Sequence, residues 1–298
     1  MRTGFWRVER LGGRTAGRIT VTQLPSVPAG QAALPTAPSA TTQGLDRVHM
    51  IVTGNTVLVT GGGSGIGRGL AEALLARGNT VIIAGRRESA LAATVAANPG
   101  MKSVVLDVAD PVSIKAVTGQ LIADYPSLNT LINAAGVAQR DDPTDRIDDT
   151  VLTGTIATNF YGPIRMASAL IEHFKRQPRA ALVHVSSTLG YLPHSGLAIY
   201  SASKAALHSY VLSQRYRLRG TSVSVIEIAP PMVATALDTN ADNPRAMPLS
   251  AYIAETMAEL ESGADEALVA SARARRDGLL NDEPGAMIRL NDMLLGSD

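Results

Sequence analysis

Tyr200 and Lys204 are the two residues whose types and spacing point most directly to chemistry. They lie four residues apart at the start of a segment, 198–219, that is expected to be helical. Residues with this spacing share one helix face, so the lysine ammonium lies beside the phenol. A neighbouring cation favours the phenolate and brings a group whose ordinary pKa is about 10 towards the range of proton transfer at neutral pH. Taken alone, such a pair is also typical of a solvent-exposed helix.

Ser187 is a second candidate for chemistry at the same place. Ser186 and Ser187 end the strand expected over residues 180–186, shortly before the Tyr200 helix. The Ser187 hydroxyl can hydrogen-bond a substrate carbonyl or alkoxide while a phenol transfers the proton. The three side chains together predict acid/base chemistry at a carbonyl or alcohol oxygen.

A glycine-rich turn follows the first expected strand. Gly61, Gly65 and Gly67 form a G-x-x-x-G-x-G pattern between the strand over 55–60 and a helix over 66–77. Glycine permits positive φ and lets backbone N–H groups approach a pyrophosphate, whose charge the helix N-terminus stabilises. Ordinary tight turns also use glycine, but this position between a strand and a helix predicts a dinucleotide site.

The end of the second expected strand predicts which dinucleotide binds. A carboxylate at this position would bind the ribose 2′-hydroxyl of NAD. Here Ala84 is followed by Gly85, Arg86 and Arg87, with no acid before Glu88. Because a guanidinium pairs well with a 2′-phosphate, we expect NADP(H) rather than NAD(H), selected by Arg86. The alternative, a solvated arginine in a loop, applies to Arg87 more than to Arg86.

The elements that position these residues alternate along the chain. Short β-branched runs and longer Ala- and Leu-rich amphipathic segments are typical of βαβ units. We expect strands over 55–60, 80–84, 102–106, 130–133, 180–186 and 222–228, with a short seventh over 266–270 and final helices over 272–280 and 284–294. The predicted fold is a single α/β domain over residues 50–298, a Rossmann-type doubly wound parallel sheet in three α/β/α layers.

Residues 1–49 are expected to form a largely disordered N-terminal arm. The arm carries six Arg against Glu9 and Asp46, and residues 23–43 show neither helical nor strand periodicity. The remaining 21 basic and 24 acidic residues give residues 50–298 a net charge of −3, although the whole chain has +1. We interpret the arm as the result of a start codon placed too early, ahead of Met50; a transit peptide and a plain flexible tail are the alternatives.

Composition excludes several classes of site. The chain has no cysteine, and its five His form no metal-binding cluster, so we expect neither thiolate chemistry nor a metal. A slightly acidic domain gives no electrostatic reason for nucleic-acid binding. Neither a membrane span nor a signal-peptide core is apparent, so we expect a cytoplasmic protein without a membrane partner.

These motifs, in this order and spacing over residues 53–260, resemble the classical subfamily of the short-chain dehydrogenases/reductases. The resemblance implies that Tyr200 is the proton donor or acceptor and that Lys204 lowers its pKa and holds the nicotinamide ribose. It also implies that Ser187, rather than Ser186, is the catalytic serine and that Asn159 holds a water of the proton relay. The implied partner of these groups is a small carbonyl or alcohol substrate.

The resemblance also implies the residues of the cofactor site. They follow the ends of successive strands and are Gly61, Ser64, Gly65, Ile66, Gly67, Arg86, Asp107, Val108, Asn133 and Gly136, with Val233 and Thr235 near the carboxamide and phosphate. Pro231 stands where the family usually has glycine, so the shape of this loop is expected to differ. The Ala-Pro-Pro-Met-Val run over 229–233 is similar to the DltE-like branch of the family.

The substrate pocket is expected between residues 189–199 and a lid over about 231–250. His194 is expected either to face this pocket or, as is more common for a loop histidine, to be exposed. His184 is expected to be a core residue and His173 a helix-surface residue. Two other functions share this scaffold: a catalytically idle NADP-binding sensor or scaffold protein, and an epimerase or dehydratase that uses the same four residues. Resemblance to the family implies a homodimer or homotetramer formed through the helices that carry Asn159 and Tyr200.

Overall fold

The computed structural model describes residues 6–10, 19–23, 50–237 and 243–295, in two units, Met1–Leu45 and Asp46–Asp298. In the first unit, β1 (Trp6–Arg10) pairs antiparallel with β2 (Ile19–Gln23), with Val8 opposite Val21. The sequence analysis expected no strand in residues 1–49, so this hairpin corrects it. The rest of the expected arm, and residues 238–242 of the expected lid, lie outside the described residues.

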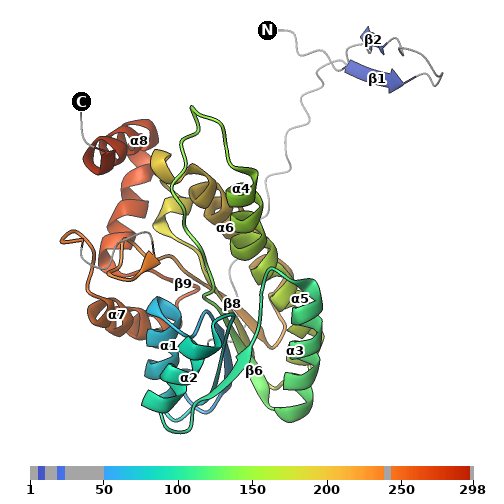
Figure 1. Ribbon diagram of the computed structural model, residues 1–298, viewed down its shortest axis with the longest axis vertical. Helices are drawn as coiled ribbons and strands as arrows, with labels where there is room; N and C mark the ends of the chain where they lie inside the picture. The colour runs from blue at the N-terminus through green and yellow to red at the C-terminus, as the bar shows by residue number, and fades with distance from the viewer. Residues whose placement is uncertain (1–5, 11–18, 24–49, 238–242, 296–298) are drawn as a thin grey trace, which may run out of the picture. The chain divides into compact units, whose positions relative to one another are not determined.

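The second unit is built on a parallel seven-stranded sheet (Figure 1). Its spatial order is β5-β4-β3-β6-β7-β8-β9. The strands are β3 (Thr56–Thr60), β4 (Thr80–Gly85), β5 (Lys102–Val105), β6 (Leu128–Asn133), β7 (Ala180–Val185), β8 (Val223–Ile228) and β9 (Glu266–Ala267). Each of the seven expected strands is therefore confirmed, within a few residues at its ends.

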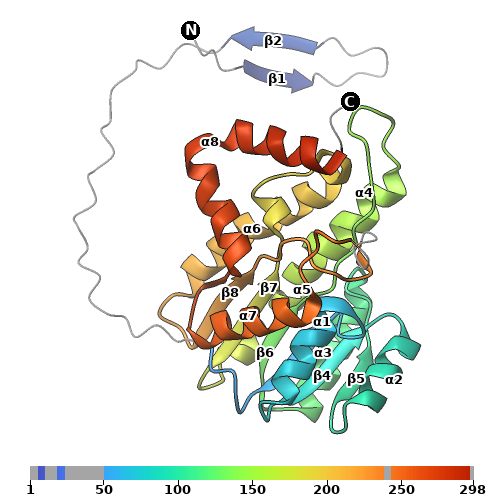
Figure 2. The same ribbon diagram turned by 90° about the vertical axis from the view of Figure 1, so that its left-hand side faces the viewer.

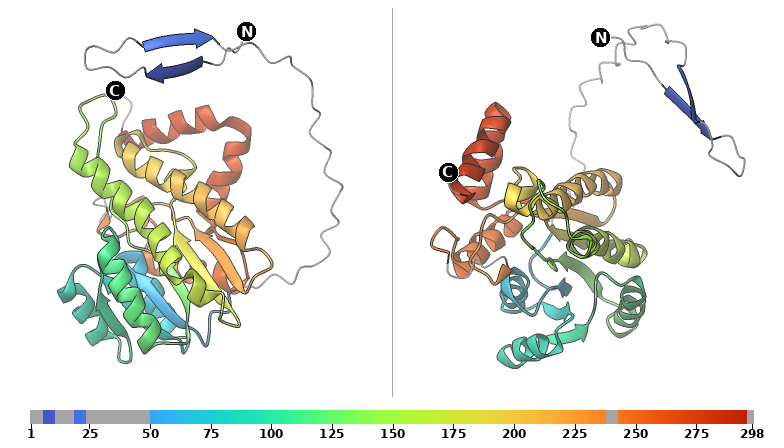
Figure 3. Two further views of the ribbon diagram at one scale, coloured as in Figure 1. Left: turned by 90° about the vertical axis from the view of Figure 1, so that its right-hand side faces the viewer. Right: turned by 45° about the horizontal axis from the view of Figure 1, so that its top comes forward.

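Eight helices accompany the sheet in the described part of the chain, and they cover both of its faces (Figure 3). They are α1 (Gly65–Leu75), α2 (Glu88–Ala97), α3 (Pro111–Asp124), α4 (Asp149–Ile156), α5 (Gly162–Phe174), α6 (Ala198–Leu218), α7 (Leu249–Glu261) and α8 (Ala270–Leu295). Asp110 caps the N-terminus of α3, because its carboxylate accepts hydrogen bonds from the N–H groups of Val112 and Ser113. The three-layer Rossmann-type fold is confirmed.

Two apolar clusters, one on each face of the sheet, form the core. On one face, side chains such as Val57 and Val59 of β3 pack against α1 and α7, which lie side by side in Figure 2. On the other face, Leu58 and neighbouring strand residues pack against α3, α5 and α6. Strands β3 and β6 are buried along their whole length, as expected for parallel strands covered on both faces.

The strand order reverses beside β3. The chain runs from β3 outward through β4 to β5, then returns to place β6 on the other side of β3 before continuing to β9. Connections leave in opposite directions at this point and open a crevice beyond the carboxyl ends of the strands. The fold therefore places a ligand site beyond Thr60 and Asn133, which pair at the ends of β3 and β6.

The C-terminal segment differs from the expectation of two separate helices. It forms one helix, α8, which continues through Pro284 and changes direction part of the way along (Figure 2). Proline inside a helix removes a hydrogen bond and bends the helix without necessarily ending it. Among the helices of the described segments, none combines the length and the apolar character that a membrane span requires.

Candidate active site

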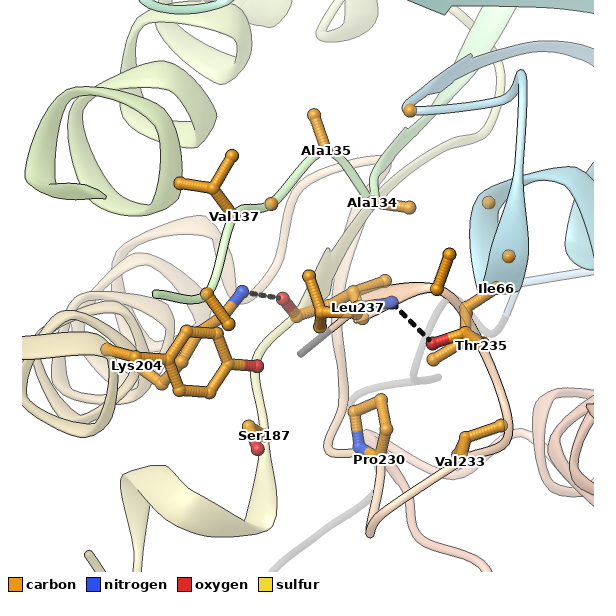
Figure 4. Close-up of a pocket in the computed structure, with 18 of the residues that line it drawn as sticks. Ile66, Ala134, Ala135, Val137, Ser187, Lys204, Pro230, Val233, Thr235 and Leu237 are labelled. Atoms are coloured by element: carbon orange, nitrogen blue, oxygen red, sulfur yellow. Dashed lines mark hydrogen bonds between the residues drawn. The ribbon is translucent and has the colours of Figure 1, made fainter. Parts of the chain in front are cut away.

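A cavity of about 560 Å³ lies beyond the carboxyl ends of the central strands. Its walls come from the glycine turn, from helix α6, which carries Tyr200, and from the loop after β8. Thirteen of the residues expected to form the site line it: Gly61, Ser64, Gly65, Ile66, Gly67, Arg86, Val108, Gly136, Ser187, Tyr200, Lys204, Val233 and Thr235. In Figure 4, Ser187 and Lys204 lie on one side of the cavity, with Ile66 and Thr235 on the other.

The glycine turn leaves no room for side chains at two of its positions. Gly61 has φ +70°, and a Cβ atom there would lie 2.8 Å from the backbone of Ala135. A Cβ at Gly67 would lie 2.5 Å from the carbonyl oxygen of Gly61. The turn leads into α1, whose first backbone N–H groups have no side-chain cap from Ser64. A helix N-terminus of this kind fits a pyrophosphate.

Arg86 and Arg87 both line the cavity beside this turn. The Arg87 guanidinium donates a hydrogen bond from Nη2 to Ser64 Oγ over 3.1 Å. The expectation assigned the phosphate to Arg86 and regarded Arg87 as a loop residue. The structure places both cations at the end of β4, next to the turn, and ties Arg87 to the turn itself.

Tyr200 and Lys204 lie in the first two turns of α6 and face the cavity. Both are almost fully buried in the chain. The Lys204 Nζ atom lies 5.7 Å from the centre of the Tyr200 ring and donates a 2.8 Å hydrogen bond to the carbonyl oxygen of Val185 at the end of β7. Ser187 follows Val185 by two residues, and its hydroxyl oxygen accepts a hydrogen bond from the N–H of Leu189. Strand β7 and helix α6 thus bring the three groups together.

The ammonium of Lys204 is in an unusual electrostatic environment. Burial lowers its pKa from 10.5 to about 8, and the nearby Glu227 carboxylate opposes this shift. Lys204 therefore gives up its proton more readily than an exposed lysine does, a perturbation that is common for residues at functional sites.

Asn159 lies behind the cavity wall and does not line it. It belongs to a π-helical turn, η1 (Ala157–Tyr161), between α4 and α5, and is fully buried. Its amide donates to the carbonyl oxygen of Val137 and accepts from the Val137 N–H, both over 2.9 Å. A Cβ at Gly136 would lie 3.5 Å from Asn159 Oδ1 and 3.8 Å from Lys204 Nζ, so both side chains lie close to Gly136. π-Helical turns frequently occur at functional sites.

Asp107 and Asn133 also lie outside the cavity lining. Asp107 follows β5 and accepts a 2.9 Å hydrogen bond from the N–H of Ala109, which orders the turn beside Val108. Asn133 is buried at the end of β6, where its amide nitrogen is 3.3 Å from Nδ1 of His184. In this structure Asp107 orders the neighbouring backbone and Asn133 contacts His184, and neither side chain lines the cavity.

The loop after β8 forms another part of the cavity wall, and its Thr235 lies beside Gly65 of the glycine turn. Pro230 accepts a hydrogen bond from the N–H of Thr188, and Met232 and Ala234 exchange backbone hydrogen bonds with Met247. These bonds need neither the N–H of Pro231 nor a glycine at that position. Val233 and Thr235 keep their expected places on the wall despite this substitution.

Thr60 is a site residue that the sequence analysis missed. Its Oγ1 accepts hydrogen bonds from the backbone N–H groups of Ala134 and Ala135, at 3.1 and 3.2 Å. These bonds join the ends of β3 and β6 where the strand order reverses. The hydroxyl at the last position of the first strand was the available signal.

Glu227 is the second missed residue. It is fully buried on β8 and accepts hydrogen bonds from the Ser186 hydroxyl and from His208 Nδ1. Burial would raise its pKa, but these hydrogen bonds outweigh that effect and the pKa lies below its ordinary value. A buried carboxylate therefore lies beneath Lys204. Its place within an apolar strand pattern was the only signal in the sequence.

Of the alternatives for His194, the structure supports the pocket-facing one, whereas the surface position expected for His173 was wrong. His194 is buried and lines the cavity, where its Nδ1 accepts a hydrogen bond from the N–H of Gly196. His173 is buried on α5, with Nε2 2.9 Å from the carbonyl oxygen of Leu128. Each ring has a backbone partner, which allows it to be buried. His184 is a core residue, as expected.

Helix α8 closes the end of the cavity nearest Ser187. The cavity lining includes Arg275 from the first turns of α8 and Leu290, Met293 and Leu294 from its end. Asn291 joins α8 to the segment before α6, because its side chain accepts from the N–H and hydroxyl of Ser195 and donates to the carbonyl oxygen of Pro193. The sequence analysis placed no site residue in α8.

Comparison with known proteins agrees with this geometry. A sequence model described as short chain dehydrogenase matches residues 55–246. The uncharacterized oxidoreductase DltE of Bacillus subtilis is 43% identical over 190 residues, which are 63% of this chain and 75% of that protein. Sulfoacetaldehyde reductase 2 of Chromohalobacter salexigens is 32% identical over 60% of this chain and 73% of its own length. The resemblance to the DltE-like branch is thus confirmed.

A solved structure shows the same architecture. A short chain dehydrogenase from Burkholderia cenocepacia, in complex with NADP, superposes with a TM-score of 0.72 at 28% identity, covering 81% of this chain and 99% of that one. The family match covers more than half of the chain, and it includes the glycine turn, Ser187, Tyr200 and Lys204. The chain therefore belongs to the short-chain dehydrogenase family, whose members are oxidoreductases that bind a nicotinamide cofactor.

Proposed function

We propose that the protein is an NADP(H)-dependent oxidoreductase that interconverts a carbonyl compound and an alcohol, with Tyr200 as its acid/base. The observation that carries the proposal is the presence of the glycine turn, Ser187, Tyr200 and Lys204 around one cavity. One end of that cavity fits a dinucleotide phosphate, and the other holds the groups suited to proton transfer at an oxygen.

Each residue of the site has a separate role in the proposed reaction. A bound nicotinamide supplies or accepts the hydride. In the direction of reduction, Tyr200 donates the proton of its hydroxyl to the carbonyl oxygen, and in oxidation the phenolate takes it back. Ser187 Oγ hydrogen-bonds the same oxygen and fixes its position. Lys204, held by the Val185 carbonyl, lies beside the phenol and favours its ionised form.

Asn159 supports this arrangement from behind the wall. Its hydrogen bonds to Val137 fix the backbone beside Gly136, and the Asn159 and Lys204 side chains both lie close to that glycine. We therefore assign Asn159 a positioning role, with Lys204 as the group through which protons reach Tyr200.

The choice of NADP(H) rests on the two arginines at the end of β4. Arg86 and Arg87 line the cavity where a ribose 2′-phosphate would lie, and no carboxylate takes that place in the cavity lining of the described segments. The Burkholderia relative was solved with NADP. The name of the sulfoacetaldehyde reductase supports reduction of a carbonyl group.

Titration with NADPH and NADH, followed by nicotinamide fluorescence, tests the proposal. We expect the wild type to bind NADPH more tightly than NADH. Because each arginine offers a guanidinium to the 2′-phosphate, Arg86→Ala and Arg87→Ala should each weaken NADPH binding by about tenfold or more, with little effect on NADH. Equal binding of the two nucleotides would contradict the cofactor assignment.

The variant Tyr200→Phe separates an enzyme from an idle nucleotide-binding protein. It keeps the ring but lacks the proton, so NADPH binding should persist while carbonyl reduction falls by about 1,000-fold. A variant that reduces carbonyl compounds as fast as the wild type would overturn the role of Tyr200.

A further inference from the structure

Three arginines in the first turns of α8 have different partners. Arg273 forms a 2.7 Å salt bridge with Glu259, and Arg276 forms one with Glu266. Arg275 has no carboxylate partner among the residues that the structure describes; its guanidinium donates one hydrogen bond, from Nη1 to the hydroxyl of Thr188 over 3.3 Å. Arg275 is therefore the arginine of this group whose charge has no protein counter-ion in the described segments.

This guanidinium is partly removed from water. Arg275 is half-buried, and its burial lowers the pKa of the group, although it stays charged at physiological pH. A cation withdrawn from water without an opposite charge destabilises the protein, and a bound anion offsets that cost. An anionic group in the cavity would supply the missing partner.

The position of Arg275 associates it with the substrate. Its partner Thr188 directly follows Ser187, the proposed ligand of the reacting oxygen. The arginines proposed to bind the cofactor phosphate, Arg86 and Arg87, instead belong to the end of β4, and Arg87 contacts Ser64 of the glycine turn. The charges of a dinucleotide phosphate thus have their own partners, and they do not account for Arg275.

The rest of this end of the cavity suits an anion. The described lining contains no Asp or Glu, and it includes two further arginines, Arg140 and Arg245. Leu189, Leu197 and Leu290 add apolar side chains to the same lining. A low-polarity wall strengthens the attraction between opposite charges, and a positive field without acidic side chains attracts anions and disfavours cations.

We propose that Arg275 determines substrate specificity by binding an acid group of the substrate, so that the enzyme acts on carbonyl compounds that carry a carboxylate or a chemically similar anion. This inference rests on the proposed function and names the substrate class of that same cavity. Arg275 holds the acid group while Ser187 and Tyr200 act on the carbonyl oxygen at the other end of the molecule.

Calorimetric binding to the complex of the full-length protein with NADP⁺ tests this inference without requiring turnover. The probes are acetoacetate, levulinate and succinic semialdehyde, each compared with its uncharged methyl ester. We expect the wild type to bind at least one acid more than about tenfold more tightly than its ester. In Arg275→Ala, binding of that acid should weaken on the order of 100-fold while ester binding changes little.

Two variants serve as controls. Arg273→Ala removes the same side chain from the same helix at a site where the charge is paired and exposed, so it should bind the acids as the wild type does. Arg275→Lys keeps the charge but loses the planar fork, so it should retain part of the preference for acids. If Arg275→Ala fails to fold, the wild-type comparison of acid with ester and the lysine variant still decide the matter.

The outcomes separate this inference from the proposed function. Failure to bind NADP⁺ or NADPH would refute the proposed function. Nucleotide binding with equal affinity for acids and esters would refute the role of Arg275 and leave the proposed function standing. A preference for acids that survives Arg275→Ala would also refute it and would assign the anion to the other cavity arginines.

Discussion

His184 lies in the core next to a residue of the candidate site. Its Nδ1 is 3.3 Å from the amide nitrogen of Asn133, and its Nε2 is 2.9 Å from Gln214 Oε1. Burial lowers its pKa to about 4, although the hydrogen bond to Gln214 opposes the shift. The neutral ring, with a proton on Nε2 and a lone pair on Nδ1, satisfies both neighbours.

This environment predicts a pH dependence of stability. In the unfolded chain, His184 takes up a proton as the pH falls through 6.5, whereas the folded protein resists protonation down to about 4. The unfolded state therefore binds more protons in this window, and the free energy of unfolding falls as the pH is lowered, on the order of 3 kcal/mol from this group. Urea denaturation above pH 6.5 and near pH 4 measures the loss.

The variant His184→Gln isolates this contribution. Glutamine keeps a donor and an acceptor but does not titrate, so the variant should lose less stability than the wild type over the same pH window. Equal losses in the two proteins would show that other groups control the acid sensitivity.

At the scale of elements, the glycine turn connects β3, α1 and the start of the β6 loop. The glycine turn requires that residue 61 has no side chain. Gly61 has a positive φ, and an added Cβ would meet the backbone of Ala135. A substitution there strains the turn and pushes two chain segments apart. The effect of this substitution on stability should therefore differ from that of the same substitution at an ordinary helix glycine.

Gly61→Ala should lower the free energy of unfolding by about 1–3 kcal/mol and abolish NADPH binding, because the turn has to move to admit the methyl group. Gly119→Ala is the matched control. Gly119 lies in α3 with no atom within 4 Å of an added Cβ, so the alanine should stabilise by about 0.5–1 kcal/mol through helix propensity. Denaturation and nucleotide titration of the two variants measure the contrast.

Local patterns predicted the elements well because their signals lie close together in the sequence. The β-branched runs predicted the strands, and the glycine-rich pattern from Gly61 to Gly67 predicted the turn between the first strand and the first helix. The burial of His173 was missed because its partner, the Leu128 carbonyl, lies 45 positions away. The helix break expected near Pro284 did not occur, since proline can bend a helix without ending it.

The candidate site was predictable only in part, for a similar reason. Tyr200, Lys204 and Ser187 are recognisable from short spacings. Arg275 is 87 positions from its partner Thr188, and nothing in the local sequence distinguishes it from the neighbouring Arg276. Only the fold shows that one of these arginines is paired and the other faces the cavity.

At the scale of the whole molecule, we expect the protein to form a homodimer or homotetramer. Large apolar side chains are exposed on the elements that carry Asn159 and Tyr200: Leu152 on α4, Tyr161 in η1, and Leu212 and Tyr216 on α6. Apolar side chains gathered on neighbouring elements are typical of a protein interface. The proposed assembly buries them between copies.

Sedimentation measurements test this proposal. The wild type should sediment as a dimer or tetramer, and Leu212→Asp should shift it towards the monomer because a charge would be buried in the interface. Val112→Asp is the matched control, because Val112 is an exposed residue of α3. This variant should leave the mass of the assembly unchanged. A monomeric wild type would contradict the assembly.

The position of α8 along the chain has a consequence for how such an enzyme diversifies. The family match ends at residue 246, and it contains Ser187, Tyr200 and Lys204. Arg275 and the apolar cavity residues of α8 lie beyond that limit. The residues proposed for proton transfer are thus encoded upstream of Arg275, which is proposed to bind the acid group of the substrate. A single recombination between the two could exchange one substrate preference for another and leave the reaction itself intact.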